Sequence, residues 1–178
     1  MRRVLNFGLV AMMAIPSAAL SQAASDVIAR EGASKVVPAP TFPPSKDLIY
    51  RIAWGVNVGP DSAHGVVPGF RSAANFLVVG NANGVPRANV RQAIVVWGTA
   101  THSLLKNEAY RALKKTDNAS APLLQALHDA GVEIIVCGEA LLNRNIARAD
   151  LLPFVKIAPN ATMALATLHA QGYAIFRP

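Results

Sequence analysis

The chain has a single cysteine, Cys137, among its 178 residues. One cysteine excludes an internal disulfide, so the thiol is either a buried, inert side chain or a working group. The four histidines are far apart and show none of the short ligand spacings of zinc sites, so we expect no metal centre. The sequence also lacks a P-loop and a G-x-G-x-x-G fingerprint, and we therefore expect no nucleotide cofactor.

Dense positive charge is also missing. The chain has 17 Lys and Arg against 10 Asp and Glu, and without Arg2 and Arg3 the remaining 15 basic residues exceed the acidic ones by five. After residue 23 the only adjacent basic pair is Lys114-Lys115, and the basic residues are not interleaved with aromatic ones. This distribution argues against a nucleic-acid partner.

Long apolar runs are absent apart from one near the start. Arg2 and Arg3 precede an apolar run from Val4 to Pro16, and Ser21-Gln22-Ala23 supplies a small-x-small cleavage motif. This layout predicts a secretory signal peptide over residues 1–23, export to a bacterial periplasm and no integral membrane segment after cleavage. An uncleaved N-terminal anchor is the alternative, although the run is short for a bilayer.

Residues 24–46 are rich in Ala, Ser and Pro, with Pro38, Pro40, Pro43 and Pro44 close together. We expect no regular helix or central strand there, because proline interrupts both. The stretch is interpreted as an extended arm, which either wraps a neighbouring subunit or forms a loose leader. Residues 47–178 then have the length of one domain.

Within that domain, strand-like and helix-like segments alternate. Short β-branched or alternating segments predict five strands, at residues 47–54, 92–97, 131–137, 152–157 and 172–176. Helical periodicity predicts helices at residues 70–80, 99–113, 118–130, 139–145 and 160–168, with Asn160 as the cap of the last. This alternation is typical of an α/β fold, with three α/β/α layers around a mostly parallel five-stranded sheet.

Cys137 stands where such a sheet presents its chemistry. It ends the predicted strand that begins at Gly131 and leads into a helix. Ligands of open parallel sheets bind beyond the carboxyl ends of the strands, and a helix start favours a thiolate. The backbone N–H groups of Gly138, Glu139 and Ala140 are candidates for holding an anion, and Gly138 leaves room for a ligand.

A second set of candidates follows the strand before it. Gly98, Thr99 and His102 come just after the carboxyl end of residues 92–97, and His102 is either a proton shuttle or anion ligand or a helix-start histidine without a partner. Arg144 and Arg148 either lend positive charge to the site or are solvated surface residues.

Three further residues have two interpretations each. Trp54 and Trp97 end strands, where they either line a pocket or close the core. His64 lies in a Gly-rich loop that is either a lid or an ordinary connection, in which case the histidine is incidental.

Four segments together resemble the DsrE/DsrF-like family over about residues 47–178. They are the runs 95–100 (VVWGTA), 131–138 (GVEIIVCG), 151–153 (LLP) and 171–174 (QGYA). The resemblance implies a compact domain with a five-stranded sheet that commonly assembles into homo-oligomers, as trimers or hexamers. In the sulfur-relay members a cysteine after the corresponding strand carries persulfide sulfur, and the residue that matches it is Cys137.

The export signal separates this chain from cytoplasmic sulfur relays, so a role in tRNA thiolation is not expected. The first hypothesis is an exported persulfide carrier or thiol-redox protein that acts through Cys137, with donor and acceptor unidentified. The second is a non-catalytic oligomeric module that binds a small anion or metabolite while Cys137 only packs. A third is a structural subunit whose Pro-rich arm docks on a partner.

Overall fold

The computed structural model describes residues 20–178. The helices and strands follow one another in the order α1 (Gln22–Glu31), β1 (Tyr50–Val56), α2 (Pro68–Ala82), β2 (Val90–Val96), α3 (Asn107–Lys114), α4 (Ala121–Asp129), β3 (Glu133–Cys137), α5 (Gly138–Leu142), β4 (Lys156–Ala158), α6 (Ala161–Ala170) and β5 (Ala174–Phe176). Three 3₁₀ segments, η1 (Arg87–Asn89), η2 (Gly98–Leu104) and η3 (Arg148–Asp150), connect them.

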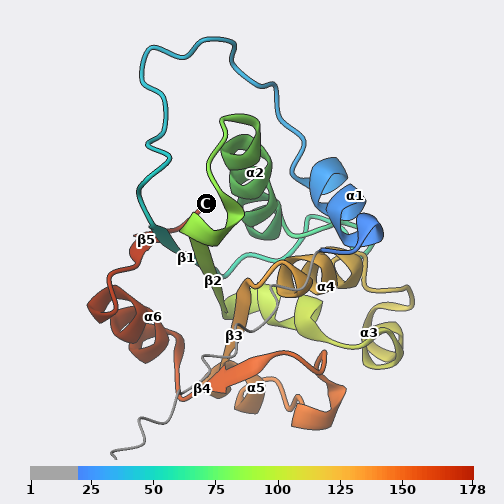
Figure 1. Cartoon of the computed structure of the whole chain (residues 1–178). Coiled ribbons are helices and arrows are strands. Elements are labelled where there is room, and N and C mark those ends of the chain that lie inside the picture. Colours follow the sequence, from blue (N-terminus) through green and yellow to red (C-terminus); the bar gives the residue numbers. More distant parts are fainter. Residues whose placement is uncertain (1–19) are drawn as a thin grey trace, which may run out of the picture.

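The five strands form one sheet in the order β4-β3-β2-β1-β5, and every neighbouring pair is parallel. Val96 of β2 pairs with Val56 of β1 on one side and with Val136 of β3 on the other. The carboxyl ends of these three strands therefore lie along one edge of the sheet (Figure 1). The predicted α/β class and five-stranded parallel sheet are confirmed.

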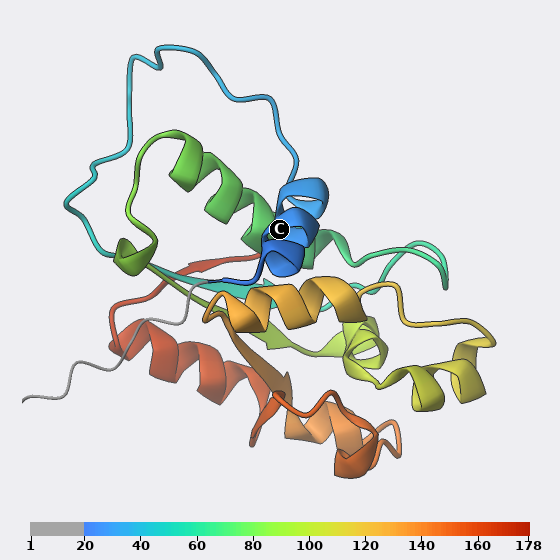
Figure 2. The ribbon, with the colours of Figure 1, turned by 45° about the vertical axis from the view of Figure 1, so that its right-hand side comes forward.

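The direction of the connections decides which face each helix covers. From β1 to β4 the chain moves along the sheet in one direction, and right-handed crossovers place the intervening helices on one face. The connection from β4 to β5 returns across the sheet, so α6 lies on the opposite face. Figure 2 shows α2 and α6 on opposite sides of the strands. The predicted three layers follow from this topology.

The larger core lies between the sheet and α2 and α4. Ile94 of β2 and Ile134 of β3 are buried there against Phe70 of α2 and Leu127 of α4. The α6 side has a smaller core, in which Ala53, Ala93 and Val95 meet Leu165 and Leu168. Each strand thus presents alternate side chains to two different helix layers, as expected for a sheet covered on both faces.

The expectation of no regular helix in residues 24–46 is wrong for its first part. Helix α1 occupies Gln22–Glu31, the hydroxyl of Ser21 accepts a hydrogen bond from Ala24 N, and Ala24 and Ile28 are buried. The prolines begin only at Pro38, so they did not restrict residues 22–31, where apolar residues four apart form a buried stripe. Helix α1 packs on α2 and α4 as an outer layer (Figure 1).

Most element boundaries differ from the prediction by a few residues, and two of these differences have a clear structural reason. The single helix expected over residues 99–113 is a 3₁₀ segment followed by α3, because Leu105 leaves the helix to form an antiparallel bridge with Leu151. Strand β4 begins at Lys156, four residues after the expected start. The preceding residues carry Pro153, and this residue has no N–H for a ladder.

The predicted cap of the last helix is confirmed, since Asn160 Oδ1 accepts a hydrogen bond from Met163 N at 2.8 Å. Over residues 20–178, none of the helices combines the length and the apolar character that crossing a membrane requires.

Candidate functional site

Cys137 is the last residue of β3 and the residue before α5. Its exposed fraction is 6%, and no group in residues 20–178 forms a hydrogen bond with its sulfur. Side chains alternate along a strand, so Cys137 shares a face with Ile135, which packs in the α6 core. The thiol is therefore placed at the predicted edge of the sheet, on the α6 face, and is nearly covered.

The turn after Cys137 packs against β4 and the loop that follows it. A Cβ added to Gly138 would lie 2.8 Å from the carbonyl oxygen of Ala158 and 3.1 Å from that of Pro159. Glu139 N donates a hydrogen bond to Pro159 O at 3.3 Å, and its carboxylate accepts one from Asn160 Nδ2 at 3.5 Å. The space beside Gly138 is thus filled by the backbone of Ala158 and Pro159, and the N–H group of Glu139 already has a hydrogen-bond partner.

Helix α6 brings a second helix start to this edge. Cys137 pairs in register with Ala158, the last residue of β4, and α6 begins three residues later at Ala161. Helix α6 contacts β3 as well as β4. Its ten residues are aligned so that the positive end of the helix dipole lies at the carboxyl edge, on the face that Cys137 shares. This arrangement favours negative charge near the thiol.

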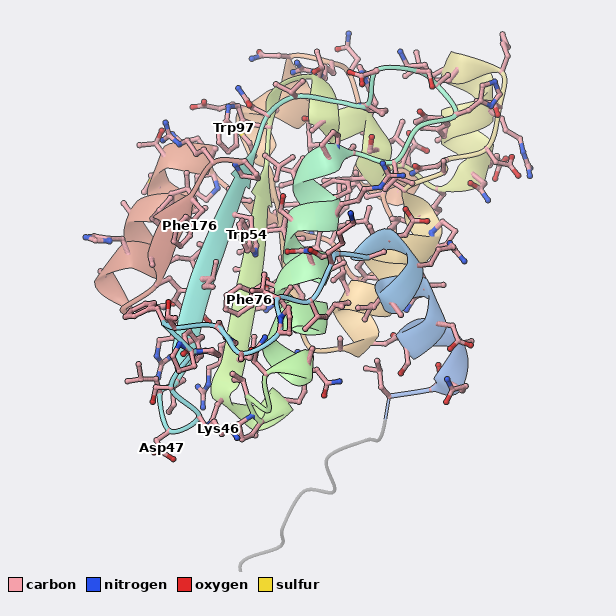
Figure 3. The ribbon with its side chains drawn as sticks, turned by 90° about the horizontal axis from the view of Figure 1, so that it is seen from above. Lys46, Asp47, Trp54, Phe76, Trp97 and Phe176 are labelled. Atoms are coloured by element: carbon pink, nitrogen blue, oxygen red, sulfur yellow. The ribbon has the colours of Figure 1, made fainter. Side chains whose placement is uncertain are left out.

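An indole and a guanidinium lie further along the same face. Trp97 follows β2, and its ring lies over Gly55 of β1, where an added Cβ would be 3.0 Å from Cη2. The guanidinium carbon of Arg177 lies 6.0 Å from the centre of the Trp97 ring, a cation–π arrangement. Figure 3 shows Trp97 at the carboxyl end of the strands. The indole partly covers the sheet, as expected if Trp97 closes the core. The Arg177 guanidinium that lies over it places a positive charge near the carboxyl ends of the strands.

Gly98 and Thr99 hold a loop in place. Gly98 has a φ of +58°, and an added Cβ would lie 2.3 Å from the carbonyl oxygen of Asn57. Thr99 Oγ1 accepts a hydrogen bond from Gly59 N at 2.9 Å and donates one to Asn57 O at 3.4 Å. These contacts hold the loop after β1 against the start of η2. Gly98 and Thr99 therefore have a structural role next to the candidate site.

His102 lies in a cationic neighbourhood. Burial lowers the pKa of its imidazole below the usual 6.5, and the nearby charges of Lys114 and Arg144 lower it further. Segment η2 contacts α5, and Arg144 Nη1 donates a hydrogen bond to Ala140 O at 3.3 Å. His102 thus lies near enough to Lys114 and Arg144 for their positive charges to act on its imidazole.

Thr101, next to His102, is fully buried, and its hydroxyl has no hydrogen-bond partner within residues 20–178. Leaving a buried hydroxyl unpaired costs about 1–3 kcal/mol. Buried polar groups ordinarily have a partner, so this hydroxyl is an exception within the described residues. No feature of the sequence indicates this unpaired hydroxyl, since a threonine after a strand is an ordinary helix-cap candidate.

The structure divides the predicted site between the two faces of the sheet. Ala100 and Leu104 of η2 and Leu141 of α5 pack in the larger core, with α2 and α4. Cys137 and Trp97 belong to the α6 face. His102 and Arg144 therefore lie at the same end of the strands as the thiol. Their segments, however, pack against the opposite face of the sheet.

The remaining predicted residues lie elsewhere. His64 bonds through Nδ1 to Thr116 Oγ1 at 2.9 Å, which fastens its loop to the end of α3. Trp54 Nε1 donates to Gln92 Oε1, and its ring stands between Phe76 and Phe176, with centroids at 6.4 and 5.7 Å (Figure 3). Over residues 20–178 no three His, Cys, Asp or Glu side chains gather in a metal-binding group.

Arg148 lines a shallow depression of about 330 Å³ with Lys106 and Lys156 at the outer edge of β4. Lys106 Nζ donates to Ala149 O, and Lys156 forms an ion pair with Glu133 at 2.8 Å. Two of these three cations thus already have partners in the protein, and the depression lies apart from the thiol.

With this geometry in hand, similarity to known proteins decides the family. A model of the DsrE/DsrF-like family matches residues 69–178, which contain β2, β3 and the Cys137 turn. The chain belongs to the DsrE/DsrF-like family.

No curated protein matches this DsrE-like chain. Among solved structures it is similar to the protein of unknown function MTH1491 from Methanobacterium thermoautotrophicum, with 19% identity and a TM-score of 0.48. That alignment covers 72% of this chain and 99% of the other. Family membership supports a sulfur-relay or related role in general terms.

Proposed function

We propose that this DsrE-like protein carries sulfane sulfur on Cys137. The observation that carries the proposal is the place of the thiol, at the carboxyl end of a central parallel strand and beside the start of α6. This edge is where open parallel sheets bind their ligands, and the helix start favours an anionic sulfur. Family membership supports the same chemistry.

The proposed transfer needs no cofactor and no net oxidation. The Cys137 thiol loses its proton to solvent, and the thiolate attacks the outer sulfur of a donor such as thiosulfate. The S–S bond of the donor breaks, sulfite leaves with the electron pair, and a new S–S bond joins the sulfur to Cys137. An acceptor thiolate then attacks the outer sulfur of the persulfide, and Cys137 leaves as a thiolate.

In this proposal the cationic region serves the anionic donor. Lys114 and Arg144 raise the local concentration of anions beyond the carboxyl ends of the strands, and Arg177 does so on the α6 face. The loop residues Gly98 and Thr99, like Gly138, Glu139 and Ala140, shape the edge around the thiol.

A reactive thiol must be accessible in the folded state, and alkylation tests this. We expect iodoacetamide to modify Cys137 in the native protein at a rate that rises with pH as the thiolate forms, far faster than global unfolding permits. The Cys137→Ser variant, which has no cysteine, is the negative control for alkylation. Modification only at the rate of unfolding would contradict sulfur transfer.

The burial of Cys137 favours a second candidate, a non-catalytic module that binds a small anion or metabolite. An exposed fraction of 6% and the packing of Gly138 on Ala158 and Pro159 are what a structural cysteine shows. In that case Cys137→Ser retains anion binding at the region of His102, and His102→Gln with Arg144→Gln loses it. Under sulfur transfer, Cys137→Ser instead abolishes turnover.

Export and assembly form part of the proposal. Residues 1–19 lie outside the described residues, and the expected cleavage motif at 21–23 falls at the start of α1. The apolar run after Arg2 and Arg3 supports export to the periplasm. A homo-oligomer is proposed from the family resemblance, and light scattering of the purified protein measures its mass.

A further inference from the structure

Helix α6 does not cover the whole of its face of the sheet. It follows the end of β4 and precedes the start of β5, so its first turn lies at the carboxyl ends of the strands and its last turn at their amino ends. The helix therefore crosses the sheet obliquely, from β4 towards β5 (Figure 1). At the carboxyl end of β1, two side chains cover the strand instead. A Cβ added to Gly55 would lie 3.0 Å from Trp97 Cη2 and 3.2 Å from Arg177 Cγ, and Gly55 is buried.

The register of the sheet places Cys137 next to these two side chains. Val96 pairs with Val136, so the residues that follow, Trp97 and Cys137, lie on neighbouring strands and on the α6 face. The side chain of Arg177 extends from the end of β5 over β1, since its guanidinium carbon lies 6.0 Å from the centre of the Trp97 ring. The guanidinium is therefore about two strand spacings, or roughly 10 Å, from the strand that carries the thiol.

The charges on the two sides of Cys137 differ. Within residues 20–178 the Arg177 guanidinium forms no ion pair. A cation–π contact leaves the N–H edge of a guanidinium free to donate to an oxyanion. On the β4 side, Glu139 accepts a hydrogen bond from Asn160, the cap of α6. This carboxylate repels an anion at the start of α6, so the charged end of a bound molecule is directed towards Arg177.

We infer that Arg177, held over Trp97, binds the charged end of the sulfur donor and selects donors whose far end is an oxyanion. The inference rests on sulfur transfer at Cys137 as proposed above, and it names the class of donor. In thiosulfate, the sulfonate oxygens accept hydrogen bonds from the guanidinium while the outer sulfur faces the thiol.

The same contact stabilises the leaving group. When the Cys137 thiolate attacks the outer sulfur, the S–S bond of thiosulfate breaks and a new S–S bond joins that sulfur to the cysteine. Sulfite leaves with the electron pair of the broken bond, next to the Arg177 guanidinium. An uncharged donor, such as a dialkyl trisulfide, gains nothing from this cation.

Alkylation by two reagents of different charge tests the inference. Iodoacetamide is neutral and iodoacetate is an anion, and both lose iodide when the Cys137 thiolate attacks their CH₂ carbon. We expect Arg177→Gln to lower the ratio of the iodoacetate rate to the iodoacetamide rate about fivefold, the upper end for an exposed ion pair. The ratio cancels any change in the fraction of thiolate. Salt at about 1 M should remove most of the difference between this variant and the wild type.

Arg51→Gln is the matched control. Arg51 lies on the same face of β1 at the amino end of the strand, so the variant loses the same charge far from Cys137 and should keep the wild-type ratio. Trp97→Leu should lower the ratio, because Arg177 loses the ring that holds it. Trp97→Phe, which keeps an aromatic face, should retain most of it. Thermal melts check that the four variants fold.

The inference alone is overturned if iodoacetamide modifies native Cys137 but Arg177→Gln and Arg51→Gln give equal ratios, or if Trp97→Leu leaves the ratio unchanged. Sulfur transfer would then stand without an anchor for the donor at Arg177. A thiol that neither reagent modifies in the native protein overturns the proposed function, and the inference that rests on it as well.

Discussion

At the residue scale, Gly98 shows how one position holds a site edge together. The left-handed backbone at φ +58° and the carbonyl of Asn57 leave no room for a side chain. We predict that Gly98→Ala destabilises the protein by about 2–4 kcal/mol, since strain and a steric clash add. Gly80→Ala, in α2 with no atom closer than 3.8 Å to the added Cβ, is the control and should be neutral or slightly stabilising. Urea unfolding measures both, and equal effects would contradict the account of the Gly98 turn.

His102 makes stability depend on pH. Burial, Lys114 and Arg144 keep the pKa of the folded imidazole below the usual 6.5, so the unfolded chain binds the proton more readily. The contribution of neutral His102 to the free energy of unfolding is therefore present above pH 6.5, and it is lost as the pH falls through the lower pKa of the folded state. We predict that His102→Gln loses less stability than the wild type between pH 7 and pH 5 in urea titrations. Parallel curves for the two proteins would show that His102 is not the responsible group.

The sequence predicts those residues of the candidate site that lie at or just after the end of a strand. It does not predict the residues that distant segments of the chain bring to the site. Cys137 ends one strand and His102 lies shortly after the end of another, and a buried β-branched run indicates both strand ends. Arg177 and Lys114 come from distant segments, and their positions depend on how β5 and α3 are placed. The division of the site between two faces depends on the alternation of side chains along β3, and a one-residue shift in the strand end reverses it.

At the element scale, α1 is the main departure from the sequence prediction. Its burial depends on Ala24 and Ile28, which contact α2 and α4, whereas the prolines that suggested an extended arm start at Pro38. The remaining elements were predictable, because each strand is a β-branched or alternating run ended by Gly, Pro or a polar cap. Only tertiary contacts could set the boundaries of η2 and β4, since Leu105 pairs with Leu151 across the fold.

Removal of the buried side chain of α1 should reveal its contribution. We predict that Ile28→Ala lowers the free energy of unfolding by about 2–4 kcal/mol, as for other buried aliphatic residues. Val37→Ala, in the exposed segment after α1, should change it by less than about 0.5 kcal/mol. If the two variants melt alike, α1 is not held on the domain.

At the scale of the whole molecule, a parallel sheet covered on both faces places the thiol at the carboxyl end of its strands. We predict that the protein isolated from a bacterial periplasm begins at Ala24, after cleavage of residues 1–23. Such a chain lacks Ser21, and the loss of this cap costs α1 about 1 kcal/mol. Intact mass of the isolated protein reports the start, and a full-length mass in the cytoplasmic fraction would contradict export.

The central claim is that Cys137 carries sulfur, and the most direct measurement is the intact mass of the reduced protein after incubation with thiosulfate or polysulfide. The account predicts a gain of one sulfur atom, mapped to Cys137, absent in Cys137→Ser and removed by an added thiol acceptor. An unchanged mass in native protein, with a gain only after unfolding, would contradict the account and leave Cys137 as a core residue.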